Sequence, residues 1–271
     1  MSDVRVLLLR TAGTNCDREL AHAFGLVGAT AHAVHINALL KEPAQLERYQ
    51  VLGFPGGFSY GDDIASGKIL ANQLIHHLKA ALQTFVAEGK LVLGVCNGFQ
   101  VLVKSGLLPG SMPQLDPSDW HPTTLTYNTS GGFEDRWVKV KCTSKKCAWL
   151  PETGGIFDLP IAHGEGRFVA RGGADGPVMT ALKQNDQIAL VYVDDRGEVA
   201  HEYPALPNGS MESVAGICDA TGRVLGLMPH PERASEATNH PQFTRGGGKA
   251  DGLVVFESAM KYLEAGRMVT V

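Results

Sequence analysis

Short apolar runs alternate with longer amphipathic stretches through the first hundred residues. Four runs rich in valine, leucine and isoleucine lie at residues 4–9, 31–36, 51–54 and 91–95. The stretches between them that fit helices are 17–26, a weaker one at 39–49, and 69–88, which ends at Gly89. Glycine is a common helix stop. Strands and helices alternating at this spacing predict βαβ units and a parallel sheet covered on both faces.

The middle of the chain follows a different pattern. Residues 108–160 are rich in proline, glycine, serine and threonine, with candidate antiparallel strands at 123–127 and 137–142. We interpret this region as loops and hairpins that elaborate the core. Apolar strands return at 188–193, 213–218 and 224–227, and a helix is predicted at 253–265. The chain is therefore predicted to be a single α/β domain over residues 1–271, with an open, mostly parallel sheet and an antiparallel hairpin elaboration.

Composition excludes several classes of partner. The 271 residues are 44% hydrophobic and 19% charged, and the net charge is −4, which argues against a nucleic-acid surface or an anionic membrane as the main partner. No apolar run approaches the roughly 20 residues that span a bilayer. The N-terminus lacks the basic start and cleavage site of a signal peptide. Five irregularly spaced cysteines favour a reducing, cytoplasmic location over a disulfide framework.

Cys96 follows the apolar run L-V-L-G-V, and Gly94 and Gly98 lie two residues to either side of it. This pattern has the form of a nucleophile elbow, a tight strand-to-helix turn that strains the central residue and leaves no room for side chains at those two positions. A helix beginning at Asn97 would favour a thiolate and offer free N–H groups to an oxyanion. The alternative is that Cys96 is one more small buried residue.

A thiol nucleophile requires a base, and His230 is the histidine best placed to act as one. It follows the apolar strand V-L-G-L-M and lies in the sequence P-H-P-E-R. Pro231 disfavours helical backbone at His230, and residues two apart in an extended segment point to the same side, so Glu232 is expected beside the imidazole. Such a carboxylate fixes the tautomer and leaves the other ring nitrogen as the base. Cys96, His230 and Glu232 thus form a predicted triad, although H-P-E also fits a solvated turn.

A second donor for an oxyanion is predicted where the strand at 51–54 ends. The sequence there is F-P-G-G-F-S-Y-G-D-D, residues 54–63. Adjacent glycines at Gly56 and Gly57 would let the backbone approach a ligand closely and turn its N–H groups inward. The same two glycines would also fit an ordinary turn.

Taken together, these segments resemble the class I glutamine amidotransferases. The cysteine segment L-G-V-C-N-G-F-Q and the distant M-P-H-P-E-R-A are shared across the class. The segments G-G-F-S-Y-G-D and A-H-G-E-G-R-F, the latter at residues 162–168, narrow the resemblance to the branch that serves purine biosynthesis. T-N-C-D near the start and A-D-G-L near the end match as well, so the resemblance covers about residues 4–262. It implies a flavodoxin-like α/β fold.

The resemblance also implies a division of labour among the residues. Cys96 attacks the side-chain amide of L-glutamine, and His230, oriented by Glu232, acts as base and then protonates the departing ammonia. Backbone N–H groups of Gly57 (or its neighbour Gly56) and Asn97 hold the oxyanion, each contributing roughly 3 kcal/mol. Water then hydrolyses the glutamyl thioester. The implied substrate contacts are Gly56, Phe58, Gln100, Asn128, Ser130 and Phe133.

The ammonia would pass to a separate ATP-dependent synthase subunit, with or without a small accessory subunit, that converts formylglycinamide ribonucleotide to formylglycinamidine ribonucleotide. The resemblance implies that ATP and magnesium act on that partner. No phosphate-binding loop is found in this sequence, and no cofactor or metal is expected in this chain. His163 and Glu165 in H-G-E-G are interpreted as a loop that senses or contacts the synthase. They also fit a second acid–base pair.

Some positions depart from the family pattern or stay open. The first loop is R-T-A-G-T-N-C-D where relatives have P-G-S or P-G-T before N-C-D, and residues 128–137 resemble the corresponding part of the fused, large synthases. Phe133 and Trp137 also fit hairpin packing residues. Cys16 is a second candidate nucleophile that lacks an elbow and an assignable base. Cys142 and Cys147 could be half of a zinc site, but we interpret them as exposed hairpin thiols.

Two functions from other classes compete with the glutaminase. A stand-alone cysteine hydrolase or peptidase could use the same elbow, although such enzymes do not usually carry the later H-P-E or the F-S-Y-G-D-D segment. A non-catalytic subunit could retain the fold, but the presence of Cys96, His230 and Glu232 together argues against it.

Overall fold

The computed structural model of the protein describes residues 4–112 and 121–269. Within these residues nine strands form one sheet in the order β2-β1-β3-β4-β11-β10-β9-β6-β7. A separate two-stranded sheet pairs β5 (Thr123–Thr126) with β8 (Arg167–Ala170). The α/β class predicted from the sequence is confirmed.

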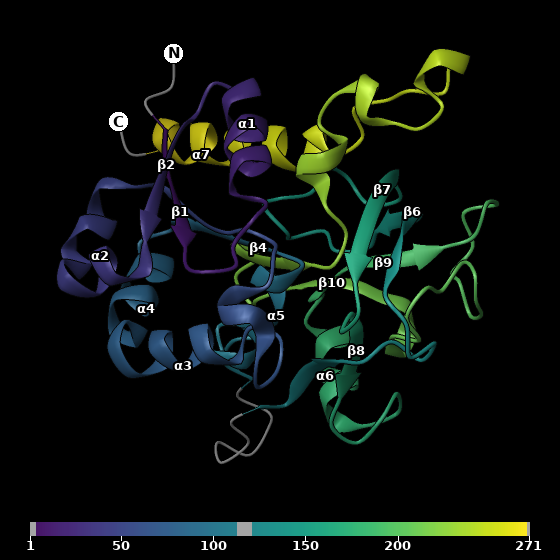
Figure 1. The fold of residues 1–271 in the computed structure, drawn as a ribbon, viewed down its shortest axis with the longest axis horizontal. Helices are drawn as coiled ribbons and strands as arrows, with labels where there is room; N and C mark the ends of the chain where they lie inside the picture. The colour runs from purple at the N-terminus through teal and green to yellow at the C-terminus, as the bar shows by residue number, and fades with distance from the viewer. Residues whose placement is uncertain (1–3, 113–120, 270–271) are drawn as a thin grey trace.

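One half of the large sheet is parallel and carries the first βαβ units (Figure 1). Its strands are β1 (Arg5–Arg10), β2 (Thr30–His35), β3 (Val51–Phe54), β4 (Leu91–Val95) and β11 (Val224–Leu227). Every residue of the last three is buried. Strands covered on both faces have continuous apolar sequences, which is why the predicted runs at 51–54, 91–95 and 224–227 match the structure.

The other half of the sheet is antiparallel. Its strands are β10 (Val214–Cys218), β9 (Ile188–Val193), β6 (Glu134–Cys142) and β7 (Ile156–His163). The strand predicted at 137–142 is part of β6 and extends the main sheet towards its edge, whereas the strand predicted at 123–127 is β5 of the separate two-stranded sheet. The sequence predicts no strand at β7, because Asp158 and Pro160 interrupt its apolar pattern. An edge strand tolerates both residues, since proline there removes no necessary ladder hydrogen bond.

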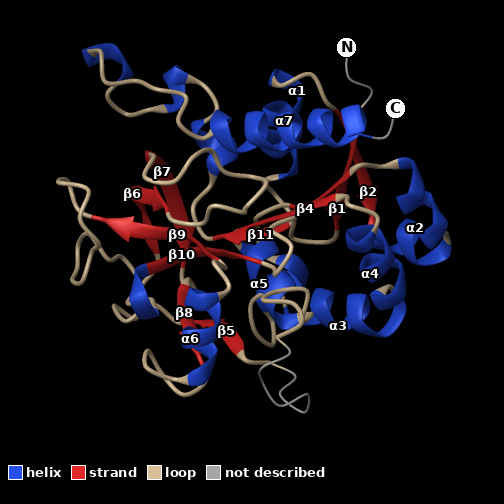
Figure 2. Ribbon diagram, turned by 180° about the vertical axis from the view of Figure 1, so that it is seen from behind, coloured by secondary structure: helices blue, strands red, loops and turns tan. Residues whose placement is uncertain are grey.

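Helices cover the sheet on both sides, with α1 and α7 on one face and α3 and α5 on the other (Figures 1 and 2). The helices are α1 (Asp17–Leu26), α2 (Ile36–Lys41), α3 (Lys68–His77), α4 (Lys79–Ala87), α5 (Asn97–Lys104), α6 (Pro177–Gln184) and α7 (Leu253–Val269). None of the helices in the described residues combines the length and the apolar character needed to cross a bilayer.

Two predicted helices differ from the structure. The single helix predicted at 69–88 is two helices, because the backbone at Leu78 (φ −124°, ψ 0°) leaves the helical region between α3 and α4. The weak helix predicted at 39–49 is the end of α2 followed by a 3-10 helix, Pro43–Arg48. Pro43 explains the second break, since proline cannot donate the hydrogen bond that would continue α2.

The interpretation of Cys142 and Cys147 as exposed thiols is wrong. Cys142 ends β6 opposite Leu190 of β9 and is 1% exposed, and Cys147 is 5% exposed. The segment after β6 folds back onto the sheet, where Trp149 Nε1 donates to the carbonyl of Arg223 (2.9 Å). Burial raises the pKa of Cys142 to about 12 and that of Cys147 well above its ordinary value. Both thiols therefore stay protonated and structural.

Candidate active site

Cys96 occupies the turn between β4 and α5, and its backbone is strained (φ 51°, ψ −106°). The two flanking glycines are required by space. A Cβ on Gly94 would lie 2.7 Å from the carbonyl oxygen of Gly98, and one on Gly98 would lie 2.0 Å from the carbonyl oxygen of Phe54. The structure thus places Cys96 in a nucleophile elbow at the carboxyl end of a parallel strand, where ligands bind in open α/β sheets.

His230 comes from the neighbouring parallel strand. The N–H of Cys96 donates to the carbonyl of Leu227 at the end of β11 (2.8 Å), so the segment that carries His230 leaves the sheet beside Cys96. Nδ1 of His230 lies 2.7 Å from Oε1 of Glu232, and the two side chains are 2% and 0% exposed. The structure therefore brings the three predicted triad residues together.

The route by which Glu232 reaches the imidazole differs from the expectation. Residues Pro231–Ala234 form a 3-10 helix, so Glu232 turns back towards His230 from a tight turn and not along an extended segment. Gly252, in the A-D-G-L segment, supports this turn, because a Cβ there would lie 1.9 Å from the carbonyl oxygen of Pro231. Its N–H also donates to the carbonyl of Ala234 (2.8 Å).

The electrostatics of His230 suit an acid–base role. Burial by itself lowers the pKa of His230, but the Glu232 carboxylate and the neighbouring Cys96 and Cys16 thiols raise it well above its ordinary value. Nε2 of His230 and Oε2 of Glu232 are buried and form no hydrogen bond of acceptable geometry within the described residues. Buried polar atoms are rarely left unpaired in a purely structural site, so Nε2 is suited to exchange a proton with a reacting group.

Gly56 brings the backbone against the catalytic side chains. We define the donor loop as residues 55–67, which connect β3 to α3. A Cβ on Gly56 would lie 2.8 Å from Cε1 of His230, 3.1 Å from Sγ of Cys16 and 3.5 Å from Cβ of Cys96. Only glycine permits this approach.

Gly57 has a backbone conformation that requires glycine. Its φ is +136°, and a Cβ there would lie 2.6 Å from the carbonyl oxygen of Gly13. Phe58 N donates to Gly13 O (2.9 Å) and Asn15 N donates to Gly56 O (3.4 Å), so Thr14 and Gly57 form a non-hydrogen-bonded antiparallel pair. In such a pair the N–H of Gly57 points away from Thr14. The roles predicted for the N–H groups of Gly57 and Asn97 stay predictions.

Cys16 also belongs to this site, and the expectation that it has no base nearby is wrong. It is 2% exposed, and Nη2 of Arg233 donates to its sulfur (3.1 Å). Its sulfur, a ring nitrogen of His230 and a carboxylate oxygen of Glu232 all lie within 4.8 Å of one another, the one group in the described residues with metal-binding potential. Glu232 is already bound to Nδ1 of His230, and we assign no metal here.

The two thiols at His230 nevertheless differ. Burial raises the pKa of Cys16, and the neighbouring His230 offsets this only in part. The backbone of Cys16 before α1 is unstrained (φ −96°, ψ 14°) and lacks an elbow. Cys96 therefore remains the candidate nucleophile.

Apart from Gly56, the predicted substrate contacts fall into two groups, one buried and one exposed. Gln100 and Asn128 are each 3% exposed, and their side-chain amides are engaged within the protein. Asn128 Nδ2 donates to the carbonyls of His163 (2.8 Å) and Gly132 (3.0 Å). Phe58 and Phe133 are 47% and 55% exposed, and Ser130 is also exposed. That these residues bind glutamine stays a prediction.

By sequence, Trp137 and Phe133 both fit packing residues, and the structure supports this role for Trp137 only. The Trp137 ring packs edge-on against His240 at 4.7 Å, which supports the packing alternative for Trp137. Phe133 is exposed and not part of the core.

The H-G-E-G segment forms a tight loop at the end of β7, and we call residues 163–166 the HGEG loop. His163 is 2% exposed, and its Nδ1 lies 3.1 Å from Oδ1 of Asn128. A Cβ on Gly166 would lie 2.3 Å from the His163 ring, so glycine is required there. Burial lowers the pKa of His163 to about 4, and the imidazole is therefore neutral near pH 7. Glu165 faces Lys104 instead of His163, which gives no support to a second acid–base pair.

Comparison with known proteins places this geometry in a family. The CobB/CobQ-like glutamine amidotransferase domain matches residues 3–263. The PurQ subunit of phosphoribosylformylglycinamidine synthase from Dehalococcoides mccartyi is 42% identical over 265 residues, covering 97% of this chain and 98% of its own length. The PurQ subunit from Archaeoglobus fulgidus is 40% identical over 269 residues, with the same two shares.

Solved structures give the same fold. A chain of the PurLQS structure from Thermotoga maritima is 32% identical, with a TM-score of 0.71, and the match covers 97% of this chain and all of that one. A glutamine amidotransferase from Thermotoga maritima has a TM-score of 0.51 at 16% identity, over 100% of both chains, a likeness of fold alone.

Proposed function

The chain belongs to the CobB/CobQ-like glutamine amidotransferase family, and on that premise we propose how it acts as the glutaminase subunit of a phosphoribosylformylglycinamidine synthase in purine biosynthesis. It is a glutamine amidotransferase, and its relatives are subunits of a synthase. The observation that carries the proposed mechanism is the juxtaposition of a strained elbow cysteine with a buried His230–Glu232 pair on adjacent parallel strands.

In the proposed reaction, the Cys96 sulfur attacks the side-chain carbonyl carbon of L-glutamine after its proton passes to Nε2 of His230. The carbonyl π bond opens, and the N–H groups of Gly57 and Asn97 bind the resulting oxyanion. When the tetrahedral intermediate collapses, the C–N bond breaks and the imidazolium protonates the leaving amide nitrogen, which departs as ammonia. Water, deprotonated by His230, then cleaves the thioester to release glutamate and restore the thiol.

Ammonia is proposed to be used by an ATP-dependent synthase subunit, which converts formylglycinamide ribonucleotide to formylglycinamidine ribonucleotide. ATP and magnesium are proposed to act on that subunit. The low exposure of the catalytic groups supports partner-dependent activity, because Cys96 and His230 are only 6% and 2% exposed, which leaves little of the sulfur open to a substrate. We expect the isolated chain to be a weak glutaminase.

One experiment tests this proposal. Ammonia release from L-glutamine is measured for the full chain alone and with the synthase subunit from the same genome, ATP, magnesium and formylglycinamide ribonucleotide. Strong stimulation by the partner and loss of ammonia release in Cys96→Ala would support it. Cys16→Ala is the matched control, since it removes the other thiol beside His230.

Other outcomes would contradict the proposal. Peptide or ester turnover without glutaminase activity, even with the partner present, would favour a stand-alone cysteine hydrolase. Full glutaminase activity without any partner would refute the expected dependence on the synthase.

A further inference from the structure

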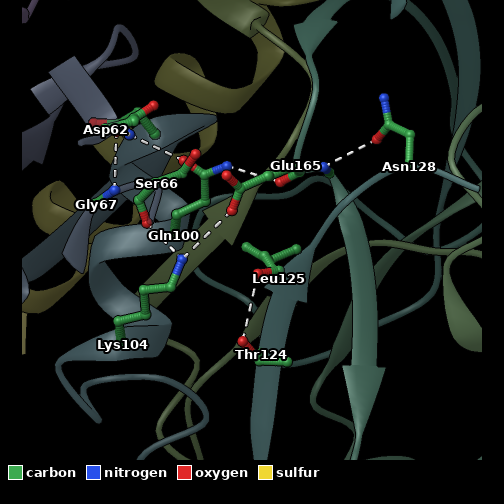
Figure 3. Close-up of polar contacts among 11 residues, drawn as sticks. Asp62, Ser66, Gly67, Gln100, Lys104, Thr124, Leu125, Asn128 and Glu165 are labelled. Atoms are coloured by element: carbon green, nitrogen blue, oxygen red, sulfur yellow. Dashed lines mark hydrogen bonds and ion pairs between the residues drawn. The ribbon is translucent and has the colours of Figure 1, made fainter. Parts of the chain in front are cut away.

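Three side chains of α5 bind two loops that flank the active site. Figure 3 shows two of them, Gln100 and Lys104, with their partners in the loops. Asn97, Gln100 and Lys104 are spaced by three and four residues, so they project from one side of the helix that begins next to Cys96. We call them the clasp. The donor loop lies on one side of the clasp and the HGEG loop on the other.

Asn97 holds the donor loop at two points. Its Oδ1 accepts a hydrogen bond from the N–H of Ser59 (3.1 Å), and its Nδ2 donates to Oδ1 of Asp62 (3.1 Å). The same Asp62 oxygen accepts from the N–H of Gly67 (3.1 Å), where the donor loop ends. Asp62 thus cross-links the loop and ties it to the first turn of α5.

Gln100 joins Asn97 to the other loop. Its Oε1 accepts from Nδ2 of Asn97 (3.0 Å), and its Nε2 donates to the carbonyl of Glu165 (2.7 Å). Both hydrogen bonds are shielded from solvent, because Asn97 and Gln100 are each 3% exposed. A displacement of the HGEG loop would therefore be passed to Asn97 through Gln100.

Lys104 completes the connection and supplies its positive charge. Nζ donates to the carbonyl of Ser66 in the donor loop (2.5 Å) and lies 4.0 Å from the Glu165 carboxylate. The Lys104 and Glu165 side chains are only 12% and 14% exposed. A partly buried amine would not be retained there without partners, since its desolvation is costly.

We propose that Lys104 and Asp62 are positioning residues for glutamine hydrolysis, which set the donor loop relative to Cys96. Gly57 is in the same loop, so an error in the position of that loop moves an oxyanion donor. This inference rests on the proposed function. It assigns roles to two residues whose hydrogen bonds and ion pair are made with Asn97 and the two loops, and not with Cys96 or His230.

The expected kinetic signature follows from when the donor acts. An oxyanion donor binds the tetrahedral intermediate more strongly than the bound substrate, so its misplacement lowers kcat and leaves KM nearly unchanged. A displacement near 1 Å can reduce the rate by about 10²-fold. We expect Lys104→Met to lower kcat of glutamine hydrolysis about tenfold or more, with KM changed by less than about threefold.

Lys90→Met provides a matched control. Lys90 also pairs with a carboxylate (Glu88, 2.9 Å) and donates to a backbone carbonyl (Glu47, 3.2 Å), and its side chain is 16% exposed. However, it precedes β4, whereas Cys96 follows that strand. Both variants are assayed in the complex with the synthase subunit, and their thermal unfolding is compared with that of the unchanged chain. Lys90→Met should retain kcat within about twofold.

A pH profile separates positioning from simple loss of structure. The charged groups around Asp62 are Glu165 from the HGEG loop, Lys104 from α5 and, next to Lys104, Lys68 from α3. Burial raises the pKa of Asp62, and the Glu165 charge adds to this effect. Ionised Asp62 is the acceptor for Asn97. Removing the cation in Lys104→Met should therefore raise the pKa of Asp62 further and move the acid limb of kcat to higher pH. Removing the anion in Glu165→Gln should lower the pKa of Asp62 and move the acid limb to lower pH.

These outcomes decide the inference. It is supported if kcat falls in Lys104→Met but not in Lys90→Met and the two acid limbs shift in opposite directions. It is overturned if Lys104→Met retains kcat within about threefold, if Lys90→Met loses as much, or if the limbs do not separate. Should Lys104→Met fail to fold, the shift of the acid limb of kcat in Glu165→Gln decides the inference by itself. Absence of glutamine hydrolysis in the unchanged complex would instead overturn the proposed function.

Discussion

His163 is predicted to make the protein less stable as the pH falls from 6.5 to 4. Burial lowers the pKa of His163 to about 4, against an ordinary value of 6.5. Between these two values the unfolded chain binds a proton at this residue and the folded chain does not. The free energy of unfolding therefore rises with pH across this window. The stabilising term is fully present above pH 6.5 and is lost progressively as the pH drops towards 4.

The magnitude follows from the two pKa values. The full difference of about 2.5 units corresponds to about 3 kcal/mol once the pH is below 4. At pH 5.0 the unfolded residue is almost fully protonated and the folded one almost fully neutral, which gives a loss of about 2 kcal/mol relative to pH 7.5. Nε2 of His163 is buried without a hydrogen-bond partner among the described residues, so it offers no acceptor to a proton bound there.

The assay compares urea unfolding at pH 5.0 and 7.5 for the unchanged chain, His163→Gln and His77→Gln. His163→Gln should reduce the pH dependence of unfolding by about 2 kcal/mol. His77, an exposed residue on α3, is the control, and its replacement should leave the pH dependence within about 0.5 kcal/mol of the original. NMR of ring-labelled histidine, with the resonance assigned from His163→Gln, should show a titration midpoint below pH 5. An unchanged pH dependence in His163→Gln would refute the reasoning.

Three further predictions concern the elbow and the two thiols. Gly98→Ala places a Cβ against the carbonyl of Phe54 and should lower the free energy of unfolding in urea by about 1–3 kcal/mol, whereas Gly25→Ala, which has open space on α1, should raise it by up to about 1 kcal/mol. Equal effects of the two substitutions would contradict the argument from space. Glu232→Gln removes the charge that raises the pKa of His230, so kcat should fall by about 10²–10⁴-fold and the basic limb of the pH profile should move to lower pH. An unmoved basic limb would contradict the role assigned to Glu232. Iodoacetamide at pH 7 should label Cys96 before Cys16 in a peptide map, because burial raises the pKa of Cys16; preferential labelling of Cys16 would reverse the assignment of the nucleophile.

The parallel half of the sheet was readable from the sequence because its strands are uniform. Strands β3, β4 and β11 are buried at every residue, so their apolar runs carry no polar interruption and match the predicted bounds. The antiparallel half was harder to predict. Strand β7 alternates between buried and half-buried positions at the edge of the sheet and contains Pro160, so its local pattern resembles a loop. Its pairing with β6, and not its own sequence, makes it a strand.

In the candidate site, too, the parts that could be predicted are those whose residues lie close together in the sequence. The elbow at Cys96 and the His230–Glu232 pair are each contained within about five residues, so motif spacing could locate them. The clasp could not be found in this way. Lys104 meets Glu165 only because β7 returns to the active-site end of the sheet, 61 positions later in the chain. No pattern in either segment indicates this contact.

Cys16 illustrates why geometry must decide between chemically equivalent groups. It is separated from Arg233 by 217 positions, yet the two are in contact, and the Cys16 sulfur borders the same imidazole as Cys96. The T-N-C-D segment marked the residue but gave no reason to place it beside His230. Once it is there, residue type no longer distinguishes the two thiols, since each has a base within reach. The strained backbone at Cys96, which glycines on both sides permit, is what presents one sulfur at the strand end beside the N-terminus of α5. Cys16 has an unstrained backbone and a burial-raised pKa, so we expect the same imidazole to activate Cys96 and not Cys16.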